Sequence, residues 1–135
     1  MYGWIAMAKR REPAPSTMQS WWHKAVFAQK GDRCLWPDCH ESAVDAHHYV
    51  HKRYGMLKYD VDNGVPLCRL HHNEADREYG REILRAFVRV SYFVDMQKRY
   101  RCVKDYLVEK GISRAEFLQT TLETLKEIVH EFDSA

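Results

Sequence analysis

The sequence lacks the features that would place the protein in a membrane or outside the cell. It has no stretch of about eighteen apolar residues, the length that a membrane helix needs. Its first residues form a short apolar segment that precedes Lys9, Arg10 and Arg11 and then two prolines, which is the wrong order for a secretory signal. We therefore expect a cytoplasmic protein, in a bacterium or a bacterial host cell, whose cysteines remain thiols.

Internal repeats and low-complexity tracts are also missing, and the formal net charge is only +2. The overall charge therefore does not indicate a nucleic-acid partner, and the local distribution of charge matters more. The 135 residues, 45% of them hydrophobic, suffice for one small domain with a modest core. A bound metal ion would add to the stability of such a core.

The N-terminal part is predicted to be an arm followed by a helix. Residues 1–15 would form a flexible basic arm, because Pro13 and Pro15 disfavour a helix there. Ser16 and Gln19 have the spacing of a capping box, so a helix is expected from Ser16 to a left-handed cap at Gly31. The tryptophans of this helix are expected to pack in the core.

The C-terminal part is predicted to be helical as well. Apolar residues recur at helical spacing up to Gly111, a candidate C-cap, and Ser113 and Glu116 begin a further helix with a capping box. The apolar side of that last helix would serve as a scaffold or as the surface of a homodimer. Cys102, which stands apart from the other cysteines, is expected to be a small core residue.

Residue types that bind metals are concentrated between positions 34 and 72. This segment holds six of the eight histidines and three of the four cysteines. Such clustering of sulfur and imidazole ligands indicates metal binding.

Two pairs of residues in this segment predict a zinc site. Cys34 and Cys39 bracket a turn, while Cys68 and His71 would face the same side of the first turn of a helix. Three cysteines and one histidine form a closed tetrahedral site, which is structural. The alternative is that the three cysteines are buried free thiols. On the helix, His72 is turned by about 100° from His71, so it would reach a different site.

The residues between the two pairs predict two strands. Residues 44–50 would form the first, with His48 on one face and His47 on the other. A turn and a second strand over residues 57–64 would follow, before a helix that begins near Pro66. An ordinary strand with one core and one surface histidine is the alternative explanation for the histidine pair.

Over residues 20–80 the chain resembles the HNH (ββα-metal) nucleases. Asp-Ala-His-His at 45–48 is similar to the first-strand motif of the family, and Asn63 stands at the position of its central asparagine. His72 follows Asn63 by nine residues (63 to 72), which is the family's spacing to the metal ligand on the helix. The pieces AHHYVHKRY, LKYDVDN and PLCRLHH are most similar to zinc-bearing phage proteins, including the NinG-type recombination group.

The resemblance implies a role for each matched residue. His48 corresponds to the general base that takes a proton from the attacking water, and Asn63 to the residue that holds the loop and helps to orient this base. His47 and His72 correspond to ligands of a catalytic divalent ion, Mg²⁺ or Mn²⁺. Asp76 stands where some members of the family have a further metal-ligating histidine.

Two departures from the family concern the zinc site. Four residues separate Cys34 and Cys39 where two are common, so Asp38 or His40 could compete as a ligand. His71 stands where the family usually has cysteine, which would change the affinity for zinc.

The chemistry of these residue types agrees with a nuclease. A neutral imidazole, with an unperturbed pKa near 6.5, suits proton abstraction from water at neutral pH. A divalent ion held by few protein ligands keeps positions open for a phosphate oxygen and the leaving 3′ oxygen. The predicted function is therefore metal-dependent hydrolysis of DNA phosphodiester bonds, and the resemblance implies 5′-phosphate and 3′-hydroxyl ends.

Basic residues surround the histidine cluster and continue into the C-terminal part. Residues 77–104 hold eight lysines or arginines against three acids, and arginines at every fourth position from 77 to 89 would form a stripe on one continuous helix. A solvated helix face is the alternative, and Gly80 would interrupt the helix. The residues predicted to bind the DNA backbone are Lys52, Arg53, Lys58, Arg69, Arg77, Arg81 and Arg85.

These patterns together predict an α+β fold that is mostly α, in a single domain. An arm (1–15) would precede a zinc-bearing nuclease core (16–80) and a helical extension (81–135). The partner would be DNA, including branched or junction DNA, and a dimer would be needed to cut two strands together. RNA remains open as a substrate, and so does a toxin-like nuclease with an immunity partner. The rival function is a non-catalytic zinc module that binds nucleic acid or protein.

Overall fold

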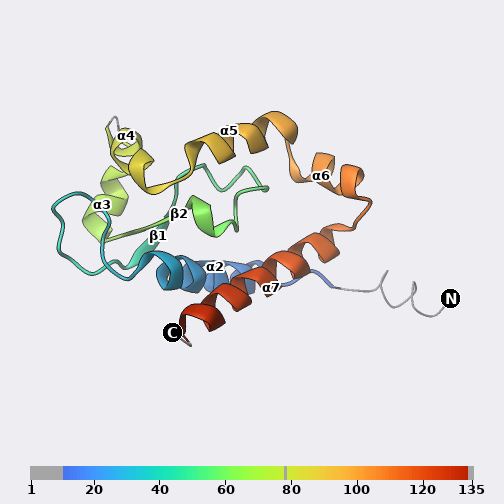
Figure 1. Ribbon diagram of the computed structural model, residues 1–135, viewed down its shortest axis with the longest axis horizontal. Helices are drawn as coiled ribbons and strands as arrows, with labels where there is room; N and C mark the ends of the chain where they lie inside the picture. The colour runs from blue at the N-terminus through green and yellow to red at the C-terminus, as the bar shows by residue number, and fades with distance from the viewer. Residues whose placement is uncertain (1–10, 78, 134–135) are drawn as a thin grey trace.

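The computed structural model describes residues 11–77 and 79–133. The fold is α+β and mostly helical, with one antiparallel sheet of two strands (Figure 1). None of the helices in the described ranges is both long and apolar enough to cross a bilayer. The elements are α2 (Pro15–Lys30), β1 (Asp45–His48), the 3-10 helix η1 (Val61–Asn63), β2 (Gly64–Leu67), α3 (Arg69–Glu74), α4 (Gly80–Leu84), the 3-10 helix η2 (Arg85–Phe87), α5 (Val90–Arg99), α6 (Val103–Lys110) and α7 (Arg114–Asp133).

Helix α2 begins one residue earlier than predicted, at Pro15. Its N-cap is Ala14, which makes no side-chain hydrogen bond, so the capping box predicted at Ser16 is wrong. Proline is favoured in the first helical position because the N–H that it lacks would have no hydrogen-bond partner in the helix there. This explains the earlier start. The helix ends before Gly31 as predicted, but that residue has φ 93° and ψ 171°, outside the left-handed helical region.

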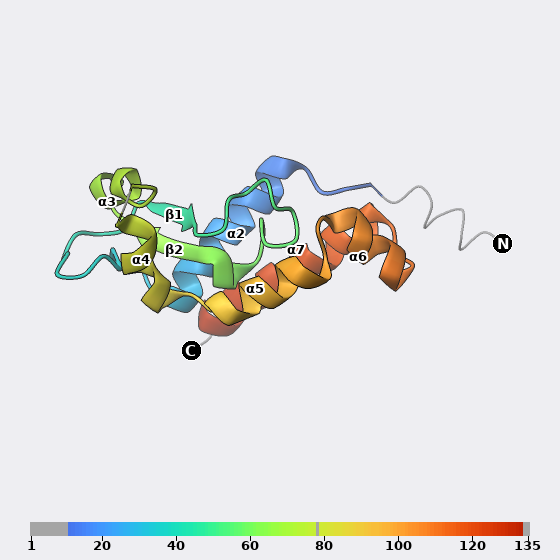
Figure 2. The same ribbon diagram turned by 90° about the horizontal axis from the view of Figure 1, so that it is seen from above.

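Helices α2 and α7 lie side by side and form the base of the molecule (Figures 1 and 2). Met18 and Trp22 of α2 are buried together with Leu118, Leu122 and Leu125 of α7. The apolar side of the last helix is therefore covered by the protein's own core, which confirms its predicted role as a scaffold.

The start of α7 and the end of α6 are capped as predicted. Ser113 Oγ accepts the N–H of Glu116 at 3.1 Å, as half of a capping box. Gly111 ends α6 in the left-handed conformation, with φ 66°. Part of the predicted flexible arm, residues 1–10, lies outside the described residues. The next two residues of the arm contact α7. The carbonyl oxygen of Arg11 accepts a hydrogen bond from a side-chain amide of α7, and Glu12 forms an ion pair with Arg114 at 2.8 Å.

The sheet is short and its second strand is not where the sequence predicted it. Residues 57–59 form turns and residues 61–63 form η1. Asp60 caps η1, since its carboxylate accepts the N–H of Asp62 at 2.9 Å. The strand follows at residues 64–67, with Pro66 inside it and opposite Ala46, so the prediction of a helix near Pro66 is also wrong. Proline is tolerated there because β2 has only one partner strand.

Close contact between α2 and β2 brings α2 against the histidines of β1. A Cβ atom at Gly64 would lie only 2.2 Å from a methyl group of Val26 and 3.0 Å from the ring of Trp22, so only glycine fits at this crossing. At the end of α2, Lys30 Nζ donates to the carbonyls of Asp62 and Gly64, at 3.1 and 2.6 Å. Burial lowers the pKa of Lys30 despite the nearby carboxylates.

The segment after α3 is broken into short pieces, so the predicted basic stripe on one continuous helix is wrong. Helix α4 covers only residues 80–84, η2 follows, and α5 begins at Val90. Gly80 packs against the backbone of Ala75, where an added Cβ would lie 2.2 Å from the carbonyl oxygen, so the chain turns there. Cys102 is exposed between α5 and α6, which contradicts the prediction of a core residue.

Candidate functional site

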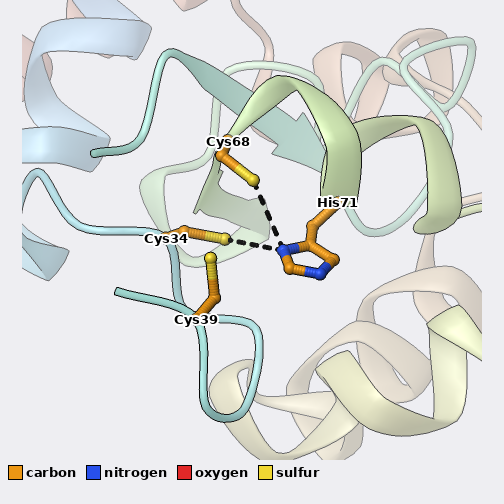
Figure 3. A group of neighbouring side chains, drawn as sticks. All are labelled: Cys34, Cys39, Cys68 and His71. Atoms are coloured by element: carbon orange, nitrogen blue, oxygen red, sulfur yellow. Dashed lines mark hydrogen bonds between the residues drawn. The ribbon is translucent and has the colours of Figure 1, made fainter. Parts of the chain in front are cut away.

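All four predicted zinc ligands are brought together at one end of the sheet. Cys34 and Cys39 come from the loop after α2, Cys68 from the end of β2 and His71 from α3, and they point toward a common centre (Figure 3). Their ligand atoms all lie within 4.8 Å of one another. Cys39 therefore belongs to the group although four residues separate it from Cys34.

The spacing of these atoms suits a metal ion. His71 Nδ1 lies 3.5 Å from the sulfur of Cys34 and 3.3 Å from that of Cys68. Metal–sulfur and metal–nitrogen bonds of about 2.3 and 2.1 Å at a tetrahedral angle would separate the two ligand atoms by roughly 3.6 Å. The group can therefore hold a metal such as zinc. Asp38 and His40, the competing ligands, are exposed and are not members of it.

The cysteines differ in how readily they ionise. Burial raises the pKa of the Cys34 thiol to about 11. Burial also acts to raise the pKa of Cys68, but the backbone N–H of His71 and the thiols of Cys34 and Cys39 donate to its sulfur, and the net shift is downward. Of these two thiols, Cys68 is therefore the one that ionises more readily to a thiolate.

Helix α3 directs its two histidines to two different places. His71 faces the cysteines and stacks on Trp36, with ring centres 4.7 Å apart and planes 2° apart. His72, the next residue, instead hydrogen-bonds through Nδ1 to the carboxylate of Asp45 at 2.9 Å. The separation follows from the helical rotation of about 100° per residue.

A second group of polar residues lies on the face of the sheet toward His72. The ring of His47 is 5.4 Å from that of His72, and its Nε2 lies 3.8 Å from a carboxylate oxygen of Asp76. This Nε2 is buried and has no hydrogen-bond partner among the described residues. A buried nitrogen without a partner is costly, and a bound cation would satisfy it. As they stand, these three side chains do not bring one ligand atom each as close together as the four residues of the cysteine group do.

Asp45 fixes the orientation of His72. Because a carboxylate only accepts, His72 donates through Nδ1, and in the neutral ring Nε2 is then the nitrogen that has a lone pair. Burial acts to raise the pKa of Asp45, but the hydrogen bond from His72 and the charges of His72 and Arg69 lower it below the usual value. Carboxylate–histidine pairs of this kind orient metal ligands in many proteins.

His48 lies on the opposite face of β1 from His47, as predicted, and is fixed from two sides. Its ring stacks on Trp22, with centres 4.0 Å apart and planes 9° apart. Its Nε2 lies 2.9 Å from the carbonyl oxygen of Lys58, to which it must donate. The neutral ring therefore keeps its lone pair on Nδ1, available to accept a proton.

Asn63 holds the loop that carries this carbonyl. It is fully buried, accepts the N–H of Val50 at 2.6 Å, and donates to the carbonyls of Val50 and Leu57 at 2.9 and 3.0 Å. It thereby ties the two ends of the segment 50–57 together. A residue with no exposed surface cannot touch a substrate, so Asn63 is a positioning residue.

His47 and His48 of β1 both line one cleft of about 460 Å³, which we call the histidine cleft. The cleft is also lined by His72, Asp76 and Arg81. Two further clefts adjoin it. One is lined by Lys52, Arg53 and Lys58, and the other by Arg53, Arg81 and Arg85. His51 lines all three clefts. Two predicted DNA contacts are not among the lining residues. Arg69 is paired at 3.1 Å with Asp45, which itself lines the histidine cleft, and Arg77 is paired with Glu74 at 3.7 Å.

The pH dependence of stability should report the burial of His48. Burial lowers the pKa of His48 to about 4, against an ordinary value of 6.5. As the pH falls below 6.5 the unfolded chain takes up a proton that the folded chain takes up only near pH 4, so stability falls across this window and is flat above it. The contribution is on the order of 2 kcal/mol.

We expect His48→Gln to reduce the slope of unfolding free energy against pH between about 4 and 6.5. Urea unfolding of the two proteins at several pH values, without added divalent ions, measures the difference. Equal slopes for the two proteins would contradict the burial of a neutral His48.

Comparisons with known protein families, with curated proteins and with solved structures give no match to this chain. The function must therefore be inferred from the geometry of the two clusters.

Sequence patterns identified the members of both clusters but not their supporting contacts. Asp45 was part of the matched motif, yet no role was predicted for it, and its partner lies 27 residues away. Trp22 was expected in the core, where it is, but not against His48. His51, at the meeting point of the three clefts, was given no role.

Proposed function

We propose that the protein is a metal-dependent endonuclease that hydrolyses DNA phosphodiester bonds. In this proposal β1, β2 and α3 form the ββα-metal core of an HNH nuclease, and the cysteine cluster holds a structural zinc ion. The observation that carries it is the convergence of His47, His72 and Asp76 on the cleft that His48 also lines.

The arrangement divides the chemical work among these residues. His47, His72 and Asp76 would hold a divalent ion, and the partnerless buried Nε2 of His47 fits this role. Such an ion, when bound, supplies charge stabilisation to the phosphoryl oxygens and the leaving oxygen. His48 takes a proton from the attacking water at Nδ1.

The environment of His48 supports proton transfer. The ring is held by Trp22 and by the carbonyl of Lys58, so its accepting nitrogen has a fixed direction. Burial lowers the pKa of His48 and outweighs the hydrogen bond to the carbonyl of Lys58, which acts to raise it. Because the pKa of His48 is lowered to about 4, the ring is neutral at physiological pH.

Basic residues around the clefts would bind the strand. Lys52, Arg53 and Lys58 follow β1, while Arg81 and Arg85 approach from α4 and η2. Their contacts to phosphate would position the DNA without reading its sequence.

Supercoiled-plasmid cleavage tests the proposal. We expect nicking with added Mg²⁺ or Mn²⁺ and none without an added divalent ion, since zinc in the cysteine cluster has no open position. The absence of cleavage on plasmid, single-stranded DNA, branched DNA and RNA would contradict the proposal and favour the zinc-bearing binding module.

Asp45→Asn should weaken the catalytic ion and not the zinc. The neutral amide is a poorer acceptor for His72 Nδ1, and loss of such a partner typically lowers metal affinity roughly 10- to 100-fold. Titration with Mn²⁺ measures the affinity, and metal analysis measures zinc. Asp133→Asn, which changes an exposed carboxylate at the end of α7, is the matched control. Unchanged Mn²⁺ affinity in Asp45→Asn would show that the pair does not support a metal ligand.

A further inference from the structure

A second cleft, of about 600 Å³, adjoins the one that contains the histidines. It lies between the segment after β1 and the elements α4, η2 and α5, and it shares Tyr49, His51 and Arg81 with the histidine cleft. We name it the arginine cleft after Arg53, Arg81 and Arg85, which line it. A strand whose phosphate reaches His48 would have its neighbouring nucleotide at this opening.

The charges of the arginine cleft suit a phosphate group. Three arginines face one acid, Glu82, among its lining residues. Arg81 is held in place, because it donates to the carbonyl of Tyr49 at 2.7 Å and lies 4.6 Å from the centre of the Tyr49 ring. Arg53 and Arg85 are exposed and form no ion pair within the described ranges. Guanidinium groups in such an array bind phosphate oxygens in a directed way.

The opposite wall of the cleft is apolar, which a site for phosphate alone would not need. Val90 and Val94 of α5 line it, and Val94 is 40% exposed. The largely buried rings of Phe93 and Tyr49 and the side chain of Gln97 also line the cleft. A flat base with polar edges, attached to a phosphate, matches this combination of apolar wall, amide and guanidinium groups.

We propose that the arginine cleft binds an unpaired nucleotide next to the phosphate that is cut. The proposal rests on the proposed nuclease function and names the substrate class of the same site. A base inside a duplex is stacked and paired, and it would have to lose both interactions to enter the cleft. DNA with a single-stranded extension at the site therefore binds more tightly than plain duplex.

Binding measured with an inactive protein tests this independently of catalysis. In His48→Ala, fluorescence anisotropy is used to compare a labelled duplex with the same duplex carrying a single-stranded extension, in Mg²⁺. We expect the extended DNA to bind about tenfold more tightly, the effect of placing one base on a protein surface. Adding Arg53→Ala and Arg85→Ala together should abolish this preference, because the phosphate contacts of the cleft are lost.

The matched control removes the same charge elsewhere. Arg101→Ala with Lys104→Ala, in the same His48→Ala protein, takes two exposed cations from the region of α6, and it should weaken both DNAs equally and keep the preference. Val94→Glu, which places a carboxylate in the wall, should abolish the preference without removing a cation. Equal affinity for both DNAs, or a preference that survives the arginine and Val94 changes, overturns the proposal.

Cleavage by the unaltered protein separates the two proposals. If it cuts none of these DNAs while the binding preference is present, the nuclease function fails and the nucleotide site stands. If it cuts plain duplex and shows no binding preference, the nuclease function stands and the nucleotide site is wrong.

Discussion

His48→Ala should reduce the rate of metal-dependent cleavage by roughly a hundred- to ten-thousandfold, which is the usual contribution of a general base. The substitution removes the one imidazole that is fixed by Trp22 and by the carbonyl of Lys58, with Nδ1 left as acceptor. Because His48 belongs neither to the cysteine cluster nor to the proposed ligands of the divalent ion, zinc content and Mn²⁺ affinity should stay the same. Plasmid nicking followed over time gives the rate, and metal analysis gives the zinc.

A control is needed because the alanine also leaves a space beside the ring of Trp22. The thermal midpoint of His48→Ala therefore has to be measured, and the rates compared well below it. His130→Ala, in which an exposed histidine of α7 is removed, should cleave at the rate of the unaltered protein. If His48→Ala retains most of the activity while folded and zinc-loaded, His48 is not the base.

Local geometry explains why the members of the cysteine cluster and of the histidine cluster could be predicted. The rotation between adjacent helical residues sends His71 and His72 to different sites wherever the helix lies, and the alternation of a strand does the same for His47 and His48. These assignments need no knowledge of the rest of the fold.

The contacts that support the site depend on distant parts of the chain and could not be predicted in the same way. The hydrogen bond between Asp45 and His72 joins two elements, and the stack of Trp22 on His48 depends on the fit of Gly64 under α2. The basic stripe failed because the helix that it required is interrupted: α3 ends at Glu74, α4 begins only at Gly80, and η2 separates α4 from α5.

Loss of the cysteine cluster should have the largest effect on stability. Cys68→Ser is expected to lose the bound zinc and to lower the free energy of unfolding by at least about 5 kcal/mol, because structural zinc typically contributes roughly 10–16 kcal/mol to the folding of small zinc domains. For a chain of this size that corresponds to a fall in thermal midpoint on the order of 15 °C or more. Calorimetry and metal analysis measure the two quantities.

The large effect on stability is expected because of the elements that the cluster connects. It joins the loop after α2 to the end of β2 and the start of α3. Without it, α3 has six residues, no side-chain cap and no fully buried residue to hold it against the sheet. His72 is carried by this helix, so Cys68→Ser should also lose Mn²⁺ binding and cleavage, although neither Cys68 nor His71 lines the cleft that contains His47, His48 and His72.

Cys102→Ser is the matched control, since this thiol is exposed and lies outside the cluster. It should keep the zinc and change the free energy of unfolding by less than about 0.5 kcal/mol, as expected for an exposed position. A Cys68→Ser protein that keeps its thermal midpoint would show that the cysteines are buried free thiols. Loss of zinc with α2 and α7 still folded would instead show that the paired helices form a stable base of their own, on which the metal-dependent site is assembled.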